Sequence, residues 1–333
     1  MPDLALSTLV IVFLAIIFDF SNGMNDSANA IATVISTRVL TPAIALGMAV
    51  ALNFFGAFMN TEVARTIGTD IVDPSSITSD VIIVALAVAA VWNIVLTVLG
   101  MPISASHALI GAIVGSVLGV HGGHAIHSQG LLKILLSLLL SPALALACSI
   151  VLMKSMYLLF RDSTPRRVNR LFGKLQIVSA AFMAYSHGSN DAQKSMGVIT
   201  MALMAGGYLT TFRVPEWVVF VCALAMALGT ALGGWRVIQT LGIGLMKLKP
   251  VHGFAAESSA AMVILGASHF GLPVSTTHVI TSSVVGVGAS RRFSAVRWSL
   301  ASKIIVSWVL TLPVCIGAAA IIQWIVTTWM HAW

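Results

Sequence analysis

Long apolar segments with very little charge constrain the fold of this chain more than any other feature of its sequence. Of its 333 residues, 58% are hydrophobic and only 9% are charged, whereas an ordinary soluble domain is about one quarter charged. The mean hydropathy is +0.98. So few charged side chains do not cover the surface of a soluble protein of this length. The sequence therefore predicts a polytopic membrane protein, with room for about ten to twelve helical segments of about 20 residues each.

The apolar segments have the pattern of membrane helices rather than of barrel strands. Residues 81–91 (VIIVALAVAAV) and 131–140 (LLKILLSLLL) are continuous apolar runs, without the alternation that a membrane β-barrel shows. Backbone groups in lipid must hydrogen-bond within their own segment, which favours helices. The predicted fold class is therefore an all-α polytopic membrane protein embedded in the lipid bilayer.

The basic residues indicate the orientation of the chain in a plasma (inner) membrane. The net charge is +7, but the basic residues lie between the apolar segments, as the positive-inside rule describes, so we do not expect a nucleic-acid partner. The densest basic cluster, at residues 161–174, is expected to be a cytoplasmic loop. Threading the segments outward from this loop places both termini outside.

Two motifs recur in the same order in the two halves of the chain. Residues 21–26 (SNGMND) match residues 186–191 (SHGSND), 165 positions later, and residues 102–107 (PISASH) match residues 273–278 (PVSTTH), 171 positions later. A repeat of this length indicates that the chain is built from two related structural units.

This repeat predicts the domain organisation. Residues 1–160 form a first membrane repeat, residues 161–174 a short basic linker and residues 175–333 a second membrane repeat. If each half crosses the membrane five times, an odd number, the two repeats insert with opposite orientations. That is the inverted-topology repeat of many secondary transporters, whose substrate site lies between the halves.

The first motif pair places polar residues inside apolar segments, where they are costly and usually functional. Each copy has a glycine that we expect to break the helix, followed by an amide and a carboxylate: Asn25 and Asp26, and Asn190 and Asp191. Such oxygens beside free backbone carbonyls suit Na⁺ or a proton. Asn and Asp also cap ordinary helix starts, but their recurrence in both halves favours a cation site.

The second motif pair is typical of the start of a half-helix, because a proline precedes hydroxyl side chains. Free N–H groups and the positive dipole end of a helix attract anions. Two such ends facing each other would hold a tetrahedral oxyanion, and the alternative is hydroxyl bonding between packed helices. The hydroxyl residues are Ser104, Ser106, Ser275, Thr276 and Thr277.

Several titratable residues are candidates for supporting roles. His107 and His278 end the two copies of the second motif and would donate to the anion, brace the half-helix or carry protons. Arg65 and Arg236 are equivalent at 171 positions apart, and Glu257 lies early in an apolar segment. Pairing with neighbouring groups near helix ends is the alternative for these charges.

At its repeated Gly-x-Asn-Asp motif the chain resembles the inorganic phosphate transporter (PiT) family, in its prokaryotic, low-affinity form. The resemblance extends over residues 18–37, 53–74, 92–111, 187–200 and 273–286. It implies secondary active symport of inorganic phosphate with Na⁺ or H⁺ by alternating access. It also implies an inverted-repeat fold with re-entrant hairpins and a homodimer, with no enzymatic activity and no cofactor besides the transported ions.

Carried onto this chain, the resemblance implies two sets of site residues. Phosphate would contact Ser104, Ser106, Ser275, Thr276 and Thr277, with Asp26, Asp191 and Gln193 as further candidates. Na⁺ would bind at Asn25, Asp26, Asn190 and Asp191. The halves differ at residues 27–29 and 192–194, which suggests that one half holds the cation and the other binds phosphate.

Two alternative functions remain at this point. Hydroxyls and helix ends do not separate phosphate from another tetrahedral oxyanion such as sulfate. An intramembrane serine hydrolase would use Ser104 with His107 or Ser275 with His278, since a Ser–His pair supports acyl transfer. The symmetric duplication of this pair, and a sequence without a Gly-x-Ser-x-Gly elbow, disfavour the hydrolase.

Overall fold

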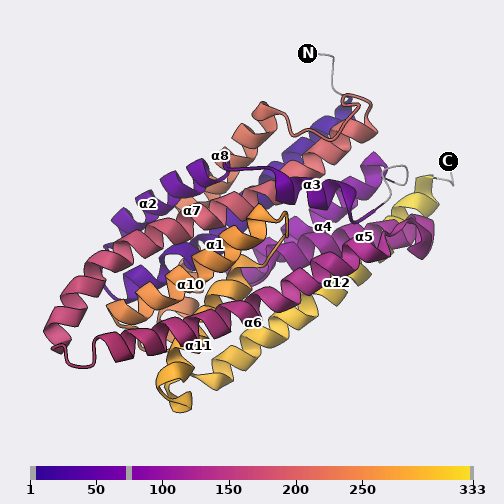
Figure 1. Ribbon diagram of the computed structural model, residues 1–333. Coiled ribbons are helices and arrows are strands. Elements are labelled where there is room, and N and C mark those ends of the chain that lie inside the picture. Colours follow the sequence, from indigo (N-terminus) through magenta and orange to yellow (C-terminus); the bar gives the residue numbers. More distant parts are fainter. Residues whose placement is uncertain (1–4, 73–76, 331–333) are drawn as a thin grey trace.

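The same order of helices occurs twice along the chain. The computed structural model describes residues 5–72 and 77–330, which form twelve α-helices and a few short 3₁₀ and π segments. Each half consists of a long helix, a pair of shorter helices that continue one another, a hairpin of two helices and a second long helix (Figure 1). The predicted all-α membrane fold is confirmed by this architecture and by the relatives described below.

The helices of the first half are α1 (Leu6–Ser36), α2 (Pro42–Gly56), α3 (Glu62–Thr69), α4 (Ser79–Val98), α5 (Ala105–His121) and α6 (Ser128–Leu159). Those of the second half are α7 (Pro165–Ala205), α8 (Glu216–Leu232), α9 (Trp235–Gln239) with the π turn η3 (Thr240–Gly244), α10 (Pro250–His269), α11 (Thr276–Arg291) and α12 (Trp298–Met330). Pro165 begins α7, so most of the linker expected at residues 161–174 is helical.

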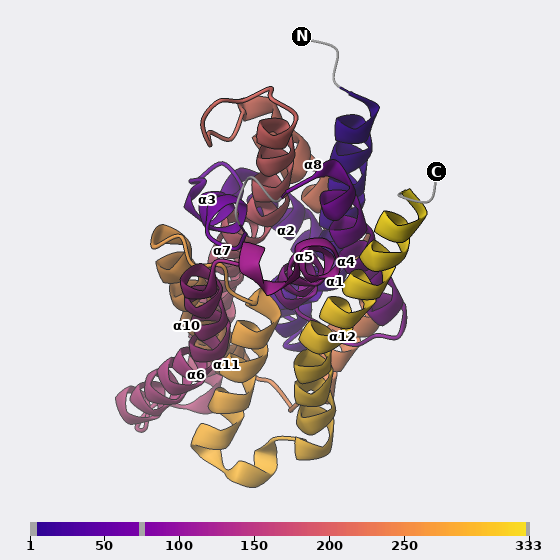
Figure 2. The ribbon, with the colours of Figure 1, turned by 90° about the vertical axis from the view of Figure 1, so that its right-hand side faces the viewer.

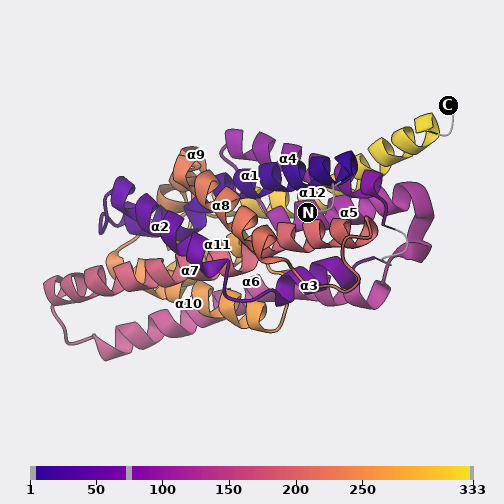
Figure 3. The same ribbon diagram turned by 90° about the horizontal axis from the view of Figure 1, so that it is seen from above.

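The start of α1 and the end of α12 lie at one end of the molecule, and the connection between α6 and α7 lies at the other (Figures 1 and 2). The first turns of α7 project past the neighbouring helices at that second end (Figure 3). The start of α1 and the end of α12 thus lie opposite the basic connection within the molecule, and the side of the membrane that each faces stays a prediction.

Only some of the twelve helices meet the length and hydropathy of a complete membrane crossing. Among the described residues, five helices are long and apolar enough to span a membrane: α1, α4, α5 with its 3₁₀ extension, α6 and α12. The pair of α8 with residues 235–244 meets the same criterion only when its two parts are taken together, and it bends by 66° between them. The long helix α7 has 41 residues but is less apolar, because it carries the polar residues 186–194.

Two segment pairs that the sequence suggested as separate crossings form hairpins whose tips meet. These are α4–α5 and α10–α11, and they approach each other from opposite ends of the molecule (Figure 1). At their tips the Ser106 hydroxyl donates to the Val274 carbonyl oxygen at 2.8 Å, and the rings of His107 and His278 lie 4.8 Å apart. The arms of a hairpin are as apolar as full crossings, so composition alone does not tell them apart.

The expected helix breaks at Gly23 and Gly188 are wrong, because α1 and α7 run through both motifs without interruption. Each glycine instead lies where another helix packs closely. A Cβ on Gly23 would collide with the Met226 carbonyl oxygen of α8, and one on Gly188 with the Asn53 carbonyl oxygen of α2. Close packing of backbones in membranes favours small residues at the contact.

The two halves contact each other reciprocally. The backbone of Phe20 in α1 lies against Gly229 of α8, and that of Tyr185 in α7, 165 positions later, lies against Gly56 of α2. When a residue of the first half contacts the second half, and its equivalent in the second half contacts the first, the two halves are related as by a two-fold axis.

Two apolar clusters leave a polar layer between them. One cluster includes Phe18 of α1 and Met196 of α7, and the other includes Ala30 of α1 and Met183 of α7. The polar residues of the two first-motif copies, 21–26 and 186–191, lie between these positions on α1 and α7 and are buried. Large exposed apolar side chains such as Leu139 and Val309 cover the outside, as expected of a surface in lipid.

Candidate functional site

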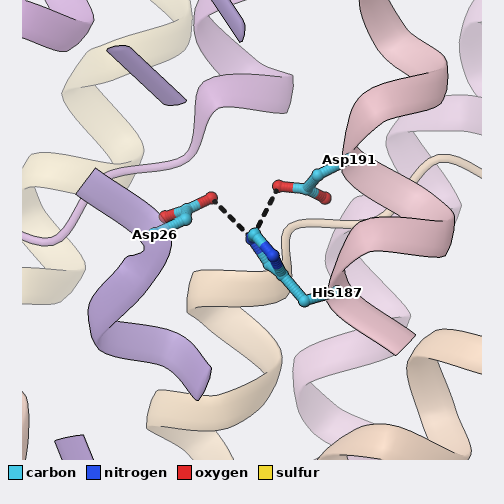
Figure 4. Close-up of side chains that lie close together, drawn as sticks. All are labelled: Asp26, His187 and Asp191. Carbon is cyan, nitrogen blue, oxygen red and sulfur yellow. Dashed lines mark ion pairs between the residues drawn. The ribbon is translucent and has the colours of Figure 1, made fainter. Parts of the chain in front are cut away.

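The centre of the polar layer holds two carboxylates, one from each half, with a histidine between them. The Nε2 atom of His187 lies 3.6 Å from Oδ2 of Asp26 and 3.4 Å from Oδ2 of Asp191 (Figure 4). All three side chains are at most 3% exposed. Their ligand atoms lie within 4.8 Å of one another, a spacing that would admit a metal ion. His187 is also held by Asn53, whose Oδ1 lies 3.0 Å from its Nδ1.

The hydroxyls at the start of α11 connect this helix to both carboxylates. Thr276 Oγ1 donates to Asp26 Oδ2 at 3.4 Å or to Asp191 Oδ2 at 3.2 Å, and Thr277 Oγ1 donates to Asp26 Oδ1 at 2.8 Å. The structure therefore brings the aspartates of both first-motif copies to the hydroxyls of the second motif. Thr276 lies 85 positions from Asp191 and 250 positions from Asp26 in the chain. A helix N-terminus, with its free N–H groups, points to the same place.

Both hairpin tips begin their second helix as the sequence predicts. Ser104 precedes α5 and its hydroxyl oxygen accepts the N–H of His107 at 3.1 Å. Ser275 precedes α11 and accepts the N–H of His278 at 3.3 Å. Serine is a favoured N-cap because its hydroxyl satisfies one of the free N–H groups of the first turn.

The two motif histidines pack at the tips rather than between the carboxylates. His107 Nδ1 lies 2.6 Å from the Ser104 hydroxyl, and the His278 ring stacks on Trp308 of α12 at 3.8 Å. Of the three roles considered for them, these contacts fit bracing of the half-helices best.

Asn25 and Asn190 make equivalent contacts to the two hairpins. The Nδ2 atom of Asn25 donates to Thr97 Oγ1 at 2.7 Å and to the Met101 carbonyl at 3.3 Å. Asn190 Nδ2 donates to the residues 171 positions further on, namely to Ser268 Oγ at 2.8 Å and to the Leu272 carbonyl at 3.4 Å. Each motif amide thus holds the first arm of one hairpin against a long helix.

The amide oxygens of the two halves differ in their partners. On α1, Oδ1 of Asn22, Asn25 and Asn29 is buried without a hydrogen-bond partner among the described residues. On α7, Asn190 Oδ1 accepts the N–H of Val274 at 3.4 Å. Buried oxygens normally have a partner, so the three oxygens on α1 are candidate ligands for a hard cation. The amide nitrogen of Asn22 donates to Asp191 Oδ2 at 3.3 Å.

A buried lysine contacts the carboxylate of the second half. Lys194 Nζ lies 2.8 Å from Asp191 Oδ1, and its side chain is 1% exposed. The residue at the equivalent position of α1 is Asn29, whose Nδ2 donates to Thr277 Oγ1 at 3.0 Å. A fully buried lysine is rare unless it is paired.

Gln193 lies beside a helix break and not beside the carboxylates. Its Oε1 accepts the N–H groups of Val63 and Ala64 at 2.9 and 3.2 Å, in the first turn of α3. Ser27 acts in the same way in the other half, since its hydroxyl accepts the N–H of Gly234 at 2.9 Å, just before α9. Each motif therefore caps the second part of a broken helix pair with one polar side chain.

Glu257 forms a separate buried cluster, and the two arginines lie outside. The carboxylate of Glu257 accepts hydrogen bonds from Thr33 Oγ1 at 2.5 Å, from Gln176 Nε2 at 3.1 Å and from the Ser179 hydroxyl. Arg65 and Arg236 are exposed, and Arg236 donates to the Val98 carbonyl at the end of α4. Arg236 thus follows the alternative of pairing near a helix end.

Sequence reasoning missed His187, Asn22 and Asn29 as members of the central cluster. Lys194 was not assigned to this cluster either. A continuous helix would have revealed all four, because residues three and four apart share one helix face. Residues 22, 26 and 29 of α1 and residues 187, 191 and 194 of α7 follow this spacing.

Buried acidic and amide groups in the interior of a multi-pass helical protein are typical of a membrane transporter. The comparisons with known proteins make the class specific. The phosphate transporter family matches residues 22–165 and 160–319. The chain belongs to this phosphate transporter family.

Individual relatives are similar over nearly the whole chain. A protein of Bacillus subtilis named "probable low-affinity inorganic phosphate transporter" is 46% identical over 98% of this chain and 98% of its own length. A protein of Rhizobium meliloti with the same name is 47% identical over 94% of this chain and 93% of its own length. A solved structure named "The sodium-dependent phosphate transporter" superposes with a TM-score of 0.91 at 25% identity, covering 97% of this chain and 100% of its own.

Proposed function

We propose that this protein is a symporter that moves inorganic phosphate together with a cation, Na⁺ or H⁺, by alternating access. The observation that carries the proposal is the convergence of Asp26 and Asp191, one from each half, at the N-terminus of α11. This convergence puts groups suited to a cation beside groups suited to an anion, which is the minimum that coupled binding requires. The names of the relatives identify the anion as inorganic phosphate.

The helix starts at the two hairpin tips are the proposed phosphate site. Ser106, Thr276 and Thr277 supply hydroxyls there, next to the free N–H groups of α5 and α11. These donors are neutral, so they bind an oxyanion without holding it as strongly as a fixed positive charge would. A protonated phosphate oxygen would in turn donate to Asp26 or Asp191, an interaction that fully ionised sulfate does not offer.

Binding of the cation and of phosphate is expected to be interdependent. Two buried carboxylates repel an incoming anion strongly, because charges interact far more at low dielectric constant than in water. A cation at Asp26 and the amide oxygens of Asn22, Asn25 and Asn29 offsets this repulsion. Phosphate therefore enters only with the cation, which is the condition for symport.

The two halves would exchange access to this site between the two sides of the membrane. The reciprocal contacts of α1 with α8 and of α7 with α2 support an inverted repeat, in which the halves rearrange around a fixed site. We place the basic α6–α7 connection in the cytoplasm and both termini outside. We also propose that the protein works as a homodimer, which cross-linking in native membranes would test.

Uptake of radiolabelled phosphate into proteoliposomes tests the proposed function. Na⁺ is varied at fixed pH, and pH is then varied at fixed Na⁺. We expect saturable uptake that depends on one of the two gradients, and similarity to a solved sodium-dependent phosphate transporter favours Na⁺. Uptake without saturation, or saturable uptake indifferent to both gradients, would rule the symporter out.

Competition distinguishes phosphate from other tetrahedral oxyanions. Arsenate carries protons as phosphate does, whereas sulfate is fully ionised near neutral pH. We expect excess arsenate to suppress phosphate uptake and sulfate to leave it unchanged. Equal competition by sulfate would instead favour the broader oxyanion transporter.

A further inference from the structure

We infer that Lys194 is a built-in cation that takes the place of one transported cation, so that only the Asp26 side of the site binds the driving ion. The inference rests on the proposed symport and concerns its stoichiometry. It starts from the difference between the two helices that carry the repeated motif. At three equivalent positions α1 has Asn22, Asn25 and Asn29, and α7 has His187, Asn190 and Lys194.

The first step is that Lys194 forms a buried ion pair with Asp191. Its ammonium nitrogen lies 2.8 Å from Asp191 Oδ1, and both side chains are at most 1% exposed. The two residues are separated by one helical turn, so the pair is fixed within α7 and does not depend on the arrangement of the two halves. An ammonium at this distance occupies the position where a cation would otherwise bind that oxygen atom.

The second step is the supply of free oxygens on each side. On α1, the helix that carries Asp26, the amide oxygens of Asn22, Asn25 and Asn29 have no hydrogen-bond partner within the part of the chain that the structure describes. Beside Asp191, the only amide of the three positions is Asn190, and its oxygen accepts the Val274 N–H. Amide oxygens that could bind a hard cation thus lie on the helix of Asp26, whereas the equivalent positions of α7 are engaged or replaced.

The third step is the balance of charge. Asp26 and Asp191 bring two negative charges into a buried layer, and the ammonium of Lys194 offsets the one at Asp191. With a neutral His187 between the carboxylates, the one at Asp26 needs a single partner of opposite charge, since an unpaired buried charge is costly. A tethered ammonium cannot leave with phosphate, so it contributes to binding the anion without adding a transported charge.

The number of driving cations per phosphate tests this inference without any variant. Proteoliposomes of the purified full chain are loaded with radiolabelled phosphate, the membrane potential is clamped at zero, and the phosphate gradient at which net flux stops is measured at several gradients of the driving cation. We expect each phosphate to move with a single cation. A ratio of two or more would overturn the inference while leaving phosphate symport intact.

The variant Lys194→Asn, which places the residue of the α1 position in α7, sharpens the test. We expect its uptake at low cation concentration to fall by about tenfold to a hundredfold, because a buried carboxylate loses its partner, and to recover at high cation concentration. The cooperativity of uptake with respect to the cation should rise by one additional ion. Unchanged cooperativity in a folded variant that still transports would contradict the inference.

Controls separate this outcome from misfolding and from failure of the proposed function. Lys154 lies on α6, is exposed and contacts none of the site residues described above, so Lys154→Asn should keep the uptake and the cooperativity of the natural protein. Lys194→Arg retains the charge, and should keep the single-cation ratio where it folds. If the natural protein takes up no phosphate under either gradient, the proposed function itself fails.

Discussion

Residues 21–29 of α1 and residues 186–194 of α7 begin from the same motif but surround their carboxylates with different chemistry. Asp26 is flanked along its helix by Asn22 and Asn29, whereas Asp191 is flanked by His187 and Lys194. The first helix offers buried oxygens without partners among the described residues, and the second offers nitrogens that contact carboxylates. The two halves therefore share a position for the acidic group and differ in the charge that balances it.

The packing around the same two segments is nearly identical by comparison. The motif glycines Gly23 and Gly188 each meet a carbonyl oxygen of a helix from the other half, and Asn25 and Asn190 hold equivalent hairpin residues. Ser27 and Gln193 each cap the helix that follows a break. The repeat thus preserves the frame of the protein, while the charged groups within it have diverged. Substituting the equivalent residues of α1 and α7 one at a time can separate the shared packing from the diverged charges.

Replacing each carboxylate in turn should give the largest difference in stability between the two halves. Asp191→Asn leaves the Lys194 ammonium buried and unpaired, which should lower the free energy of unfolding by about 3–5 kcal/mol. Asp26→Asn leaves no ammonium behind and should cost clearly less. Denaturant unfolding of the purified variants in detergent measures both.

The double variant Asp191→Asn with Lys194→Asn provides the control for this comparison. Removing both charges should restore much of the stability that Asp191→Asn alone loses, because no buried charge remains unpaired. Equal destabilisation by the two single Asp variants, without recovery in the double variant, would show that the ion pair does not distinguish the halves.

Packing at the motif glycines should be equally sensitive in both halves. Gly23→Ala and Gly188→Ala each push a methyl group into a carbonyl oxygen of a neighbouring helix, and we expect a loss of about 1–3 kcal/mol or more from overpacking. Gly47→Ala on α2 has open space around it and should be neutral or slightly stabilising. Thermal unfolding monitored by circular dichroism makes the comparison, and a clear asymmetry between the two motif glycines would contradict a shared frame.

Removing the two motif amides should change the apparent affinity for the cation unequally. Asn25→Ala and Asn190→Ala each remove the same pair of hairpin contacts, but of the two only Asn25 has an oxygen without a partner among the described residues. We expect Asn25→Ala to raise the cation concentration for half-maximal uptake by about tenfold relative to Asn190→Ala, in proportion to one lost interaction with a charged group. Cation titrations of phosphate uptake make the comparison, and a larger shift for Asn190→Ala would place the cation in the other half.

The helix caps should give the smallest effects. Gln193→Ala removes the acceptor for two N–H groups of α3, and Ser27→Ala removes the acceptor for the Gly234 N–H. Each should lower the free energy of unfolding by about 0.5–2 kcal/mol with little change in the cation requirement. A loss of phosphate affinity in Gln193→Ala without a loss of stability would restore the direct phosphate contact that the family resemblance suggested.

Local signals in the sequence were sufficient for some of these features. The apolar runs predicted a helical membrane protein, and the repeated motifs identified both carboxylates. The starts of α5 and α11 at Ser104 and Ser275 followed from residues that act on their own neighbours, through capping of the next turn.

Features that depend on distant neighbours did not follow from the sequence. Gly23 and Gly188 suggested helix breaks, but a glycine costs a helix only about 1 kcal/mol, and here it permits close contact with another helix. The family resemblance suggested Gln193 as a phosphate ligand. Its contacts with Val63 and Ala64 could not be read from the sequence, because these residues lie about 130 positions away. The hairpin arms were counted as crossings because apolar side chains look alike whether they face lipid or protein.

Accumulation of phosphate against its own gradient tests the central claim most directly. Proteoliposomes containing the natural protein start with equal phosphate on both sides, and a gradient of the driving cation is then imposed. The symport account predicts that internal phosphate rises above the external concentration and falls back when an ionophore collapses the cation gradient. Equilibration to equal concentrations without accumulation, under both Na⁺ and proton gradients, would contradict it.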